Sequence, residues 1–390
     1  MSRHTWRVFR RRIDELRQRP ILDYGICRST GGGEFRFTGG FESVTDSHTL
    51  WVRSGALTIP VSLAGAWTWL LPMQEGFPEA FDPVEETPER IRWNRISALN
   101  EGAKVFVGGE LALRDNRWTF VSTKENPLLV IFYDGPDHSL TARAIRAGRH
   151  RNEYWNALTP YALVLGALCE IFIAVNFLYR PAFRLTVITS LAAVFIPLFP
   201  LVPPGVLFTL AYRRLWRRGR VFRAYRDLVR LPFRYLPGGE GRCRLPGGEW
   251  YGSCRLETLS DDMRERIPLL IPEREQKKND GWYVYGALDG PEEGGDLSGS
   301  TEPFAFTEPS ASTEPSASAE AAVPRGEVPH EPLDPFATFG AVPGSPAVLA
   351  RRYNFTAYAL ETVSWILLLA GIGLNVFFIR MIFVLFLAAL

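Results

Sequence analysis

Residues 157–178 read ALTPYALVLGALCEIFIAVNFL and residues 185–212 read LTVITSLAAVFIPLFPLVPPGVLFTLAY, with only Tyr179–Arg184 between them. A run of about 20 apolar residues matches the ~30 Å hydrocarbon core of a bilayer. We therefore expect two transmembrane helices that form a hairpin. The four prolines of the second run predict that its helix is kinked or broken, because proline removes a backbone donor.

A third apolar segment lies near the C-terminus, within residues 355–390. Ala357–Phe378 is long enough to span a bilayer, and Arg380 interrupts the apolar run. Met381–Leu390 is too short to span alone, so it either continues the helix or folds back to the interface. The expected fold class is thus a membrane protein with three helical spans and a separate β domain.

Arginines are distributed unequally on the two sides of the expected hairpin. Seven follow the second run between Arg213 and Arg226, whereas the linker holds only Arg180 and Arg184. By the positive-inside rule, the arginine stretch and the β domain before the hairpin face the cytoplasm of a multi-pass inner-membrane protein. We expect an interfacial helix at the start of residues 213–290, with anionic lipid contacted by Arg213, Arg214, Arg217, Arg218, Arg220 and Arg223.

Residues 24–140 have the pattern of a small β domain. Apolar and polar residues alternate with the strand period in several short runs, and glycine pairs mark turns, including one expected at Gly39-Gly40. The expected strands are Glu34–Val44, His48–Arg53, Leu57–Leu63, Lys104–Leu113, Arg117–Ser122 and Leu128–Tyr133. A turn is expected at Asp115-Asn116, between the fourth and fifth of these strands. Short strands with one long connection favour a closed OB-type barrel, and a β-sandwich is the alternative.

One segment of this domain resembles a known family. Asn100–Leu111 reads NEGAKVFVGGEL and is followed by Pro127-Leu128-Leu129-Val130; with Leu57–Leu63 as an earlier strand, this is similar to the GIDE-type domain over about residues 45–134. The resemblance implies an OB-like barrel of the kind found in membrane-bound E3 ligases and bacterial membrane proteins. The ligases also carry a RING domain, which needs eight Cys/His zinc ligands, and the four cysteines here cannot supply it.

The N-terminal segment, residues 1–23, is basic and amphipathic. It holds seven arginines, with Trp6, Phe9, Ile13 and Leu16 at helical spacing. Such a helix can lie on an anionic membrane surface. The alternative is that it flanks a further helix upstream.

Two other regions have distinct compositions. Residues 236–290 form a small polar segment with expected strands at Trp250–Leu256 and Trp282–Leu288. Cys243 and Cys254 are interpreted as free thiols, and the alternative is that they face each other across a hairpin. Residues 291–346 are of low complexity with a repeated Thr-Glu-Pro, so we expect a disordered linker. Its Asp334-Pro335-Phe336 is either a short docking motif or without a role.

Two polar residues, Glu170 and Asn176, lie inside the first expected span, where a carboxylate is costly and is a candidate functional site. Hydrogen bonding between helices is the alternative explanation. No phosphate-binding loop, HExxH or GxSxG motif occurs, and the five histidines are scattered, so we assign no catalytic, cofactor or metal residues.

These observations favour a non-enzymatic, membrane-tethered interaction protein whose β domain binds a protein partner, with lipids as a second partner. Arginines interleave with tryptophans, but the acidic loop between Glu75 and Glu89 argues against nucleic acid. The alternative function is that of a membrane enzyme or a transporter accessory subunit that uses Glu170.

Overall fold

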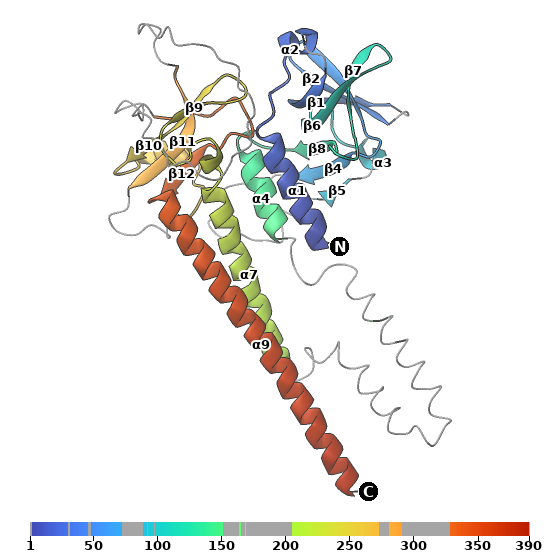
Figure 1. Cartoon of the computed structure of the whole chain (residues 1–390), viewed down its shortest axis with the longest axis vertical. Coiled ribbons are helices and arrows are strands. Elements are labelled where there is room, and N and C mark those ends of the chain that lie inside the picture. Colours follow the sequence, from blue (N-terminus) through green and yellow to red (C-terminus); the bar gives the residue numbers. More distant parts are fainter. Residues whose placement is uncertain are drawn as a thin grey trace, which may run out of the picture.

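The computed structural model describes residues 2–29, 32–45, 48–71, 89–91, 93–96, 98–150, 205–272, 281–290 and 328–389, together with Val164 and Leu168. Two β domains lie side by side at one end, and two long helices extend away from them (Figure 1). The first expected span, most of the second, and the candidate residues Glu170 and Asn176 lie outside the described residues.

Five strands of the first β domain close into a mixed barrel. They are β1 (Gly33–Val44), β2 (Thr49–Ser54), β3 (Leu57–Ser62), β6 (Lys104–Arg114) and β7 (Arg117–Val121). Their order around the ring is β1-β2-β3-β7-β6, closed by pairing between β1 and β6, and only β3 and β7 run parallel. The predicted barrel is confirmed, and the sandwich alternative is wrong.

Three further strands extend the sheet beyond β6 in the order β8-β4-β5. They are β8 (Leu129–Tyr133), β4 (Trp67–Leu71) and β5 (Glu89–Arg90). Strand β4 was not predicted, because WTWLL lacks the alternation of apolar and polar residues that marks a half-exposed strand. Two short helices, α2 (Tyr24–Ser29) and α3 (Trp93–Ile96), lie in the connections.

Gly39-Gly40 is not the turn that we expected, because β1 continues through both residues. The strand pairs with β6 as far as Gly40 and with β2 from Gly40 onward. A Cβ atom on Gly39 would lie 2.3 Å from the carbonyl oxygen of Arg53. Glycine is therefore required here for a close approach of two backbones where the strand changes partners.

The hairpin between β6 and β7 follows the prediction. Asp115 and Asn116 both have positive φ, 49° and 59°, as a two-residue type I′ turn requires. Gly108 has a packing role, since a Cβ atom there would lie 2.5 Å from the Cδ1 atom of Leu16.

Helices α1 (Ser2–Leu16) and α4 (Ser139–His150) pack beside the barrel, against its β8–β4 extension. Phe9, Ile13 and Leu16 are fully buried, and the rings of Phe9 and Trp69 lie 4.9 Å apart. The amphipathic helix is therefore present, but protein rather than lipid covers its apolar face. A helix lying on the membrane surface was thus the wrong interpretation of this face.

The second β domain is an antiparallel sheet of four strands in the order β12-β11-β10-β9. The strands are β9 (Arg242–Arg244), β10 (Trp250–Leu256), β11 (Trp282–Leu288) and β12 (Gly340–Pro343), and α8 (Asp261–Arg266) follows β10. The predicted bounds of β10 and β11 are confirmed. Cys243 lies opposite Tyr251, and Cys254 lies opposite Val284, so the two thiols do not face each other and are free.

The end of the expected disordered linker is ordered, which corrects the predicted boundary at residue 346. His330 exchanges backbone hydrogen bonds with Ala287, and Gly340–Pro343 is strand β12. Phe336 is fully buried, with its ring 4.1 Å from that of Phe106 in the barrel. The low-complexity composition of this segment did not indicate that these side chains would anchor it. Residues 291–327 lie outside the described part of the chain.

A buried polar junction joins the two β domains. Arg36 of β1 forms an ion pair with Asp334 at 2.7 Å, and both side chains are at least 97% buried. Arg17, just after α1, donates to the carbonyl oxygens of Phe336 and Leu231, each at 3.1 Å. The hydroxyl of Tyr235 donates to the carbonyl oxygen of Arg17 at 2.8 Å. These bonds connect the barrel, the end of α1, the residues that follow α7 and the segment before β12.

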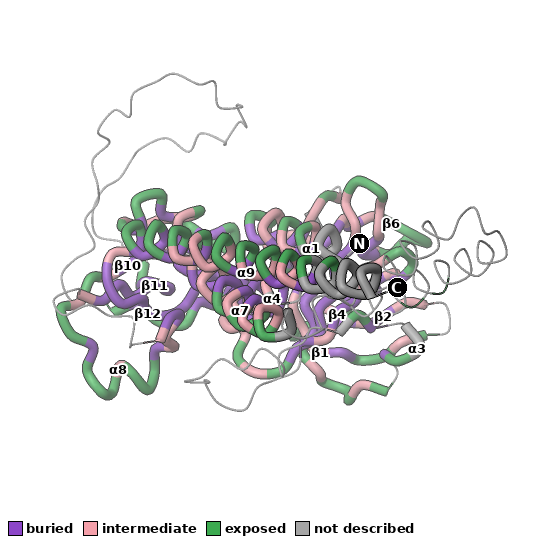
Figure 2. The backbone as a smooth tube through the Cα atoms, turned by 90° about the horizontal axis from the view of Figure 1, so that it is seen from below, coloured by how far each residue is buried: buried purple, intermediate pink, exposed green. Residues whose placement is uncertain are grey.

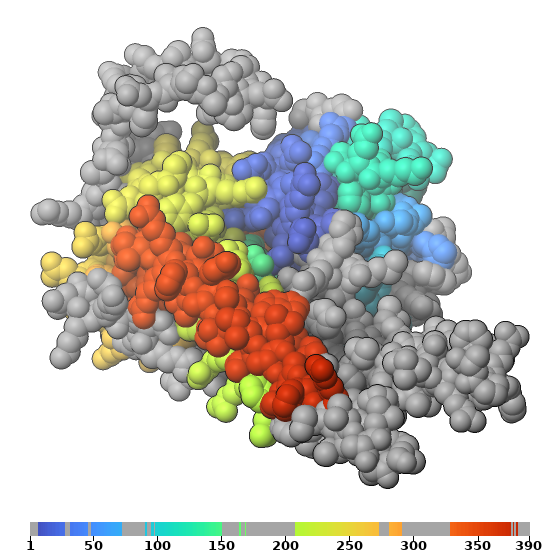
Figure 3. Space-filling model, turned by 60° about the horizontal axis from the view of Figure 1, so that its bottom comes forward, coloured from blue at the N-terminus to red at the C-terminus, as the bar shows by residue number. Residues whose placement is uncertain are grey.

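Helices α7 (Gly205–Val229) and α9 (Pro346–Ala389) pack along each other and form the stalk below the β domains (Figures 1 and 3). A short 3-10 helix, η3 (Pro232–Arg234), follows α7. The helix α9 continues to Ala389, so the C-terminal tail extends the helix and does not fold back. The arginine stretch is likewise part of α7 rather than a separate interfacial helix.

Among the described residues, one segment is long and apolar enough to cross a membrane, Pro346–Asn375 of α9. Its mean hydropathy is 1.6, and only 17% of its most apolar window is buried in the protein. Exposed residues accordingly recur along the described length of α9 (Figure 2).

The junction generates a stability prediction. Asp334→Ala leaves the Arg36 guanidinium buried without its counterion and should lower the free energy of unfolding by about 3–5 kcal/mol. Denaturant unfolding of the full chain in detergent, followed by tryptophan fluorescence, measures this change. The control is Asp262→Ala, which removes an ion pair whose side chains are both 76% exposed and should change stability by less than about 0.5 kcal/mol. Equal effects of the two substitutions would contradict the structural role of the junction.

Candidate functional site: an arginine-lined cleft

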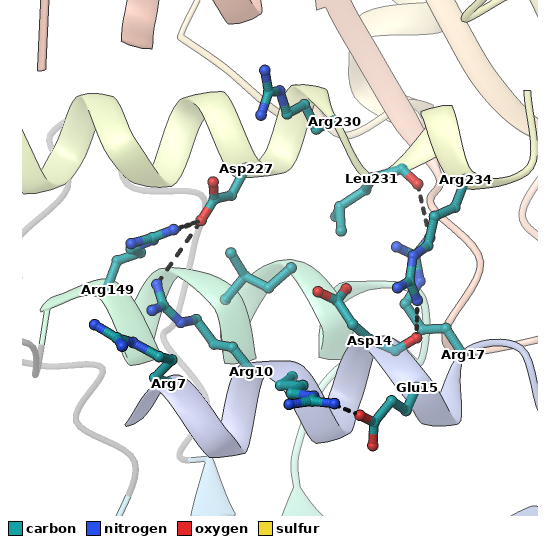
Figure 4. Close-up of a pocket in the computed structure, with 12 residues that line it drawn as sticks. Arg7, Arg10, Asp14, Glu15, Arg17, Arg149, Asp227, Arg230, Leu231 and Arg234 are labelled. Carbon is teal, nitrogen blue, oxygen red and sulfur yellow. Dashed lines mark hydrogen bonds and ion pairs between the residues drawn. The ribbon is translucent and has the colours of Figure 1, made fainter. Parts of the chain in front are cut away.

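A cleft of about 610 Å³ opens between α1, α4 and the C-terminal end of α7 (Figure 4). Arginines dominate its wall: seven line it, against three carboxylates. The lining residues are Arg7, Arg10, Arg11, Asp14, Glu15, Arg17, Ile145, Arg149, Asp227, Arg230, Leu231 and Arg234. The cleft therefore carries a clear excess of positive charge.

The amphipathic pattern of α1 explains why these side chains converge. Arg7, Arg10 and Asp14 are spaced by three and four residues, so they share one face of the helix. The apolar face that contains Phe9 and Ile13 is buried among β4, β8 and α4, which leaves the polar face toward α7.

Asp227 is the centre of the charge network. Arg149 binds one of its carboxylate oxygens with Nη2 at 2.5 Å and Nε at 2.6 Å, and Arg226 binds the other at 2.6 Å. The Nη1 atom of Arg10 lies 3.9 Å from the same carboxylate. One carboxylate thus faces three arginines and cannot neutralise all of them.

Arg10 is the least satisfied of these arginines. Its side chain is 14% exposed, and its buried Nε and Nη1 atoms have no hydrogen-bond partner among the described residues. Burial and, next, the repulsion from Arg149 lower the pKa of Arg10 to about 10, although Asp227 acts in the opposite direction. Burial also lowers the pKa of Arg149.

Other arginines of the cleft have partners. Arg17 is held by backbone carbonyls at the floor, Arg11 binds Glu15 at 2.9 Å, and Arg234 donates to the carbonyl oxygen of Asp14. By contrast, Arg7 and Arg230 are exposed, and neither forms an ion pair with a carboxylate of the described residues.

The six arginines expected to contact lipid divide into two groups. Arg213, Arg214, Arg217 and Arg218 are exposed on α7. Arg220 and Arg223 face α9 instead, where both bind Glu361: Arg223 through two hydrogen bonds of 2.8 and 2.7 Å, and Arg220 at 3.6 Å. Two of the predicted lipid contacts are therefore bonds within the protein.

Glu361 was missed by the sequence analysis, although it lies inside the apolar segment Ala357–Phe378. A carboxylate within an apolar segment is the sequence feature that could have identified Glu361 as a residue with a partner or a role. Next to it, Tyr212, Trp216 and Trp365 form an aromatic cluster with ring centroids 5.9–6.1 Å apart. Arg220 stacks on Trp216 at 4.2 Å.

The cleft residues were visible in the sequence only as separate basic segments. Arg7 and Arg10 belong to the N-terminal segment, Arg149 precedes the first apolar run, and Arg230 follows the arginine stretch. No local pattern indicates that these segments meet. In the described part of the chain, no group of three or more His, Cys, Asp or Glu side chains is arranged to hold a metal ion.

Comparison with known proteins finds no matching family model, no matching curated protein and no matching solved structure.

The contact between α7 and α9 generates the second prediction. Glu361→Gln should lower the free energy of unfolding by about 2 kcal/mol, because hydrogen bonds to charged groups contribute roughly 1.5–3 kcal/mol. Arg223→Gln should cost a similar amount, and the double substitution should cost less than the sum of both. Denaturant unfolding measures all three variants, with the exposed Arg218→Gln as control. Strictly additive losses would show that Arg223 and Glu361 are not coupled.

Proposed function

We propose that this chain is a membrane-tethered interaction protein. In this proposal α9, and the two apolar runs within residues 157–212, anchor the chain as a multi-pass protein of the inner membrane. The β domains form a cytoplasmic platform that binds a protein partner. The observation that carries the proposal is the combination of a long, mostly exposed apolar helix with two β domains locked together by a buried polar junction.

The features of the stalk support membrane insertion. At ~1.5 Å per residue, the 44 residues of α9 extend about 66 Å, roughly twice the ~30 Å of a bilayer core. The stretch of α9 around Glu361 pairs with the arginines of α7, which suits the headgroup region, whereas the exposed Ile366 and Leu369 that follow it suit lipid tails. Trp216 and Trp365 lie at the boundary, where aromatic residues are enriched.

The strand order supports an OB-type assignment of the barrel. If the five ring strands are numbered in chain order, their order around the ring is first-second-third-fifth-fourth, and the third and fifth are parallel. This arrangement is a small Greek-key barrel. We propose that it is a GIDE-type domain on the basis of Asn100–Leu111, which forms the turn into β6 and most of that strand. OB-type barrels commonly present loops and one sheet face to a partner.

The membrane part of the proposal predicts a difference between two equally exposed positions on α9. Val348 is 64% exposed and Leu369 is 62% exposed, so protein alone protects neither. In a chain whose four native cysteines are replaced by serine, a cysteine at 348 should react with a membrane-impermeant maleimide in inside-out vesicles. A cysteine at 369 should react only after detergent is added. Equal labelling of both positions would exclude insertion of α9.

The partner part is tested by site-specific photocrosslinking in intact cells. Leu113 is 57% exposed at the β6–β7 hairpin of the barrel, and Asp262 is exposed on α8 of the second domain. A photoreactive residue at 113 should yield a discrete crosslinked species that the probe at 262 does not. Absence of any crosslink from the barrel surface, sampled at the exposed Arg53 and Arg117 as well, would contradict a partner-binding role.

A further inference from the structure

The arginine-lined cleft has no role in the function proposed above, and its charge is not balanced by the residues that the structure describes. Seven arginines meet three carboxylates, and these carboxylates are partly occupied: Asp227 by Arg149 and Arg226, and Glu15 by Arg11. A buried guanidinium without its hydrogen-bond partners is costly. An anion bound between α1 and α7 would supply the negative charge and the hydrogen-bond acceptors that the described residues of the cleft do not provide.

We propose that the arginine cleft binds a phosphate ester, supplied either by the headgroup of an anionic phospholipid or by a soluble phosphorylated small molecule. Arg7 and Arg10 of α1 are its principal ligands, and Arg230, the residue after α7, also lines the cleft. This inference depends on the cleft alone and does not require the proposed partner or the membrane span.

The chemistry of the available donors favours phosphate. In the described part of the chain, the buried Nε and Nη1 atoms of Arg10 have no hydrogen-bond partner, and Arg7 is an exposed residue of the same cleft. Guanidinium groups bind phosphate oxygens in a bidentate manner, and several arginines around one anion match its multiple acceptor oxygens. A single carboxylate ligand would offer fewer acceptors for the same excess of positive charge.

The shape of the site favours a small ligand over a polymer. Its volume of about 610 Å³ falls within the range of ligand pockets, roughly 300–1,000 Å³. The walls come from three helices, α1, α4 and α7, with Arg17 anchored at the floor by the carbonyl oxygens of Phe336 and Leu231. Asp14 would repel a bound anion, because its carboxylate lines the cleft and forms no ion pair with any described residue.

The position of the cleft accommodates either source of phosphate. Arg149 is in the last turn of α4, eight residues before Ala157, where the first expected span begins, so one wall of the cleft is near in sequence to the expected membrane segment. The opening is also exposed to solvent through Arg7 and Arg230. Only a direct comparison of a lipid probe with a soluble probe separates these sources.

The test is calorimetric titration of the purified full chain in uncharged detergent micelles with two probes, pyrophosphate and dioctanoyl phosphatidylglycerol. Arg7→Gln combined with Arg10→Gln should weaken binding about tenfold or more, since the loss of even one charge-assisted hydrogen bond is of that size. Arg7→Gln combined with Arg230→Gln is the second variant; both side chains are exposed, so it preserves folding even if the substitution of Arg10 does not.

The matched control is Arg114→Gln combined with Arg117→Gln, which removes the same charge from exposed residues at the β6–β7 hairpin. It should change affinity less than about twofold, because these charges lie outside the cleft and are screened by salt. Asp14→Asn removes the opposing carboxylate and should tighten binding.

Each outcome decides the proposal. Binding of pyrophosphate that is lost in the cleft variants supports a soluble phosphate ester as the ligand. Binding of phosphatidylglycerol alone, with the same loss, supports a lipid headgroup. If neither probe binds, or if the cleft and control variants weaken binding equally, the cleft is not a phosphate site. None of these results depends on a protein partner, so failure here leaves the proposed interaction role intact.

Discussion

The ion pair between Arg36 and Asp334 is the interaction on which the arrangement of the two β domains depends. Both charges are almost fully buried, so each requires the other, and the pair joins residues that are nearly 300 positions apart in the chain. Arg17 reinforces the contact by binding the carbonyl oxygens of Phe336 and Leu231. Phe336 fills the space beside Phe106, so burial of an aromatic ring and satisfaction of buried charges act at the same place.

This junction also determines the positions of the helices. Because α1 leads directly into Arg17, the bonds at Arg17 fix the C-terminal end of α1 against the residues that follow α7. The apolar face of α1 packs against the barrel extension, and Arg10 on its polar face lies 3.9 Å from Asp227 of α7. The arginine cleft is thus a consequence of the same packing that joins the domains. An anion bound there would strengthen the contact between α1 and α7 and would couple ligand binding to domain position.

The stalk is held together by different interactions from those that join the β domains. Its two helices are held together by Glu361 with Arg220 and Arg223, and by stacking among Tyr212, Trp216 and Trp365. Apolar side chains on the same helices, such as Leu207, Ile366 and Leu369, are exposed. A stalk of this kind combines a polar segment near the β domains with an apolar segment below it, which is the order that a bilayer surface imposes on a helix that enters it.

The sequence alone determined those features that depend on local pattern. Alternation predicted most barrel strands and both long strands of the second sheet, the Asp115-Asn116 turn was predicted from its residue types, and apolar length marked the helix of the last segment. Tertiary structure decided the rest. Gly39-Gly40 became the place where a strand changes partners, the basic helix α1 was covered by protein, and Asp334 with Phe336 ordered a segment whose composition predicted disorder. The cleft could not be predicted either, because its arginines come from segments far apart in the chain. Long-range contacts among such residues depend on which faces of the β domains remain uncovered. The local sequence around each residue does not indicate which faces these are.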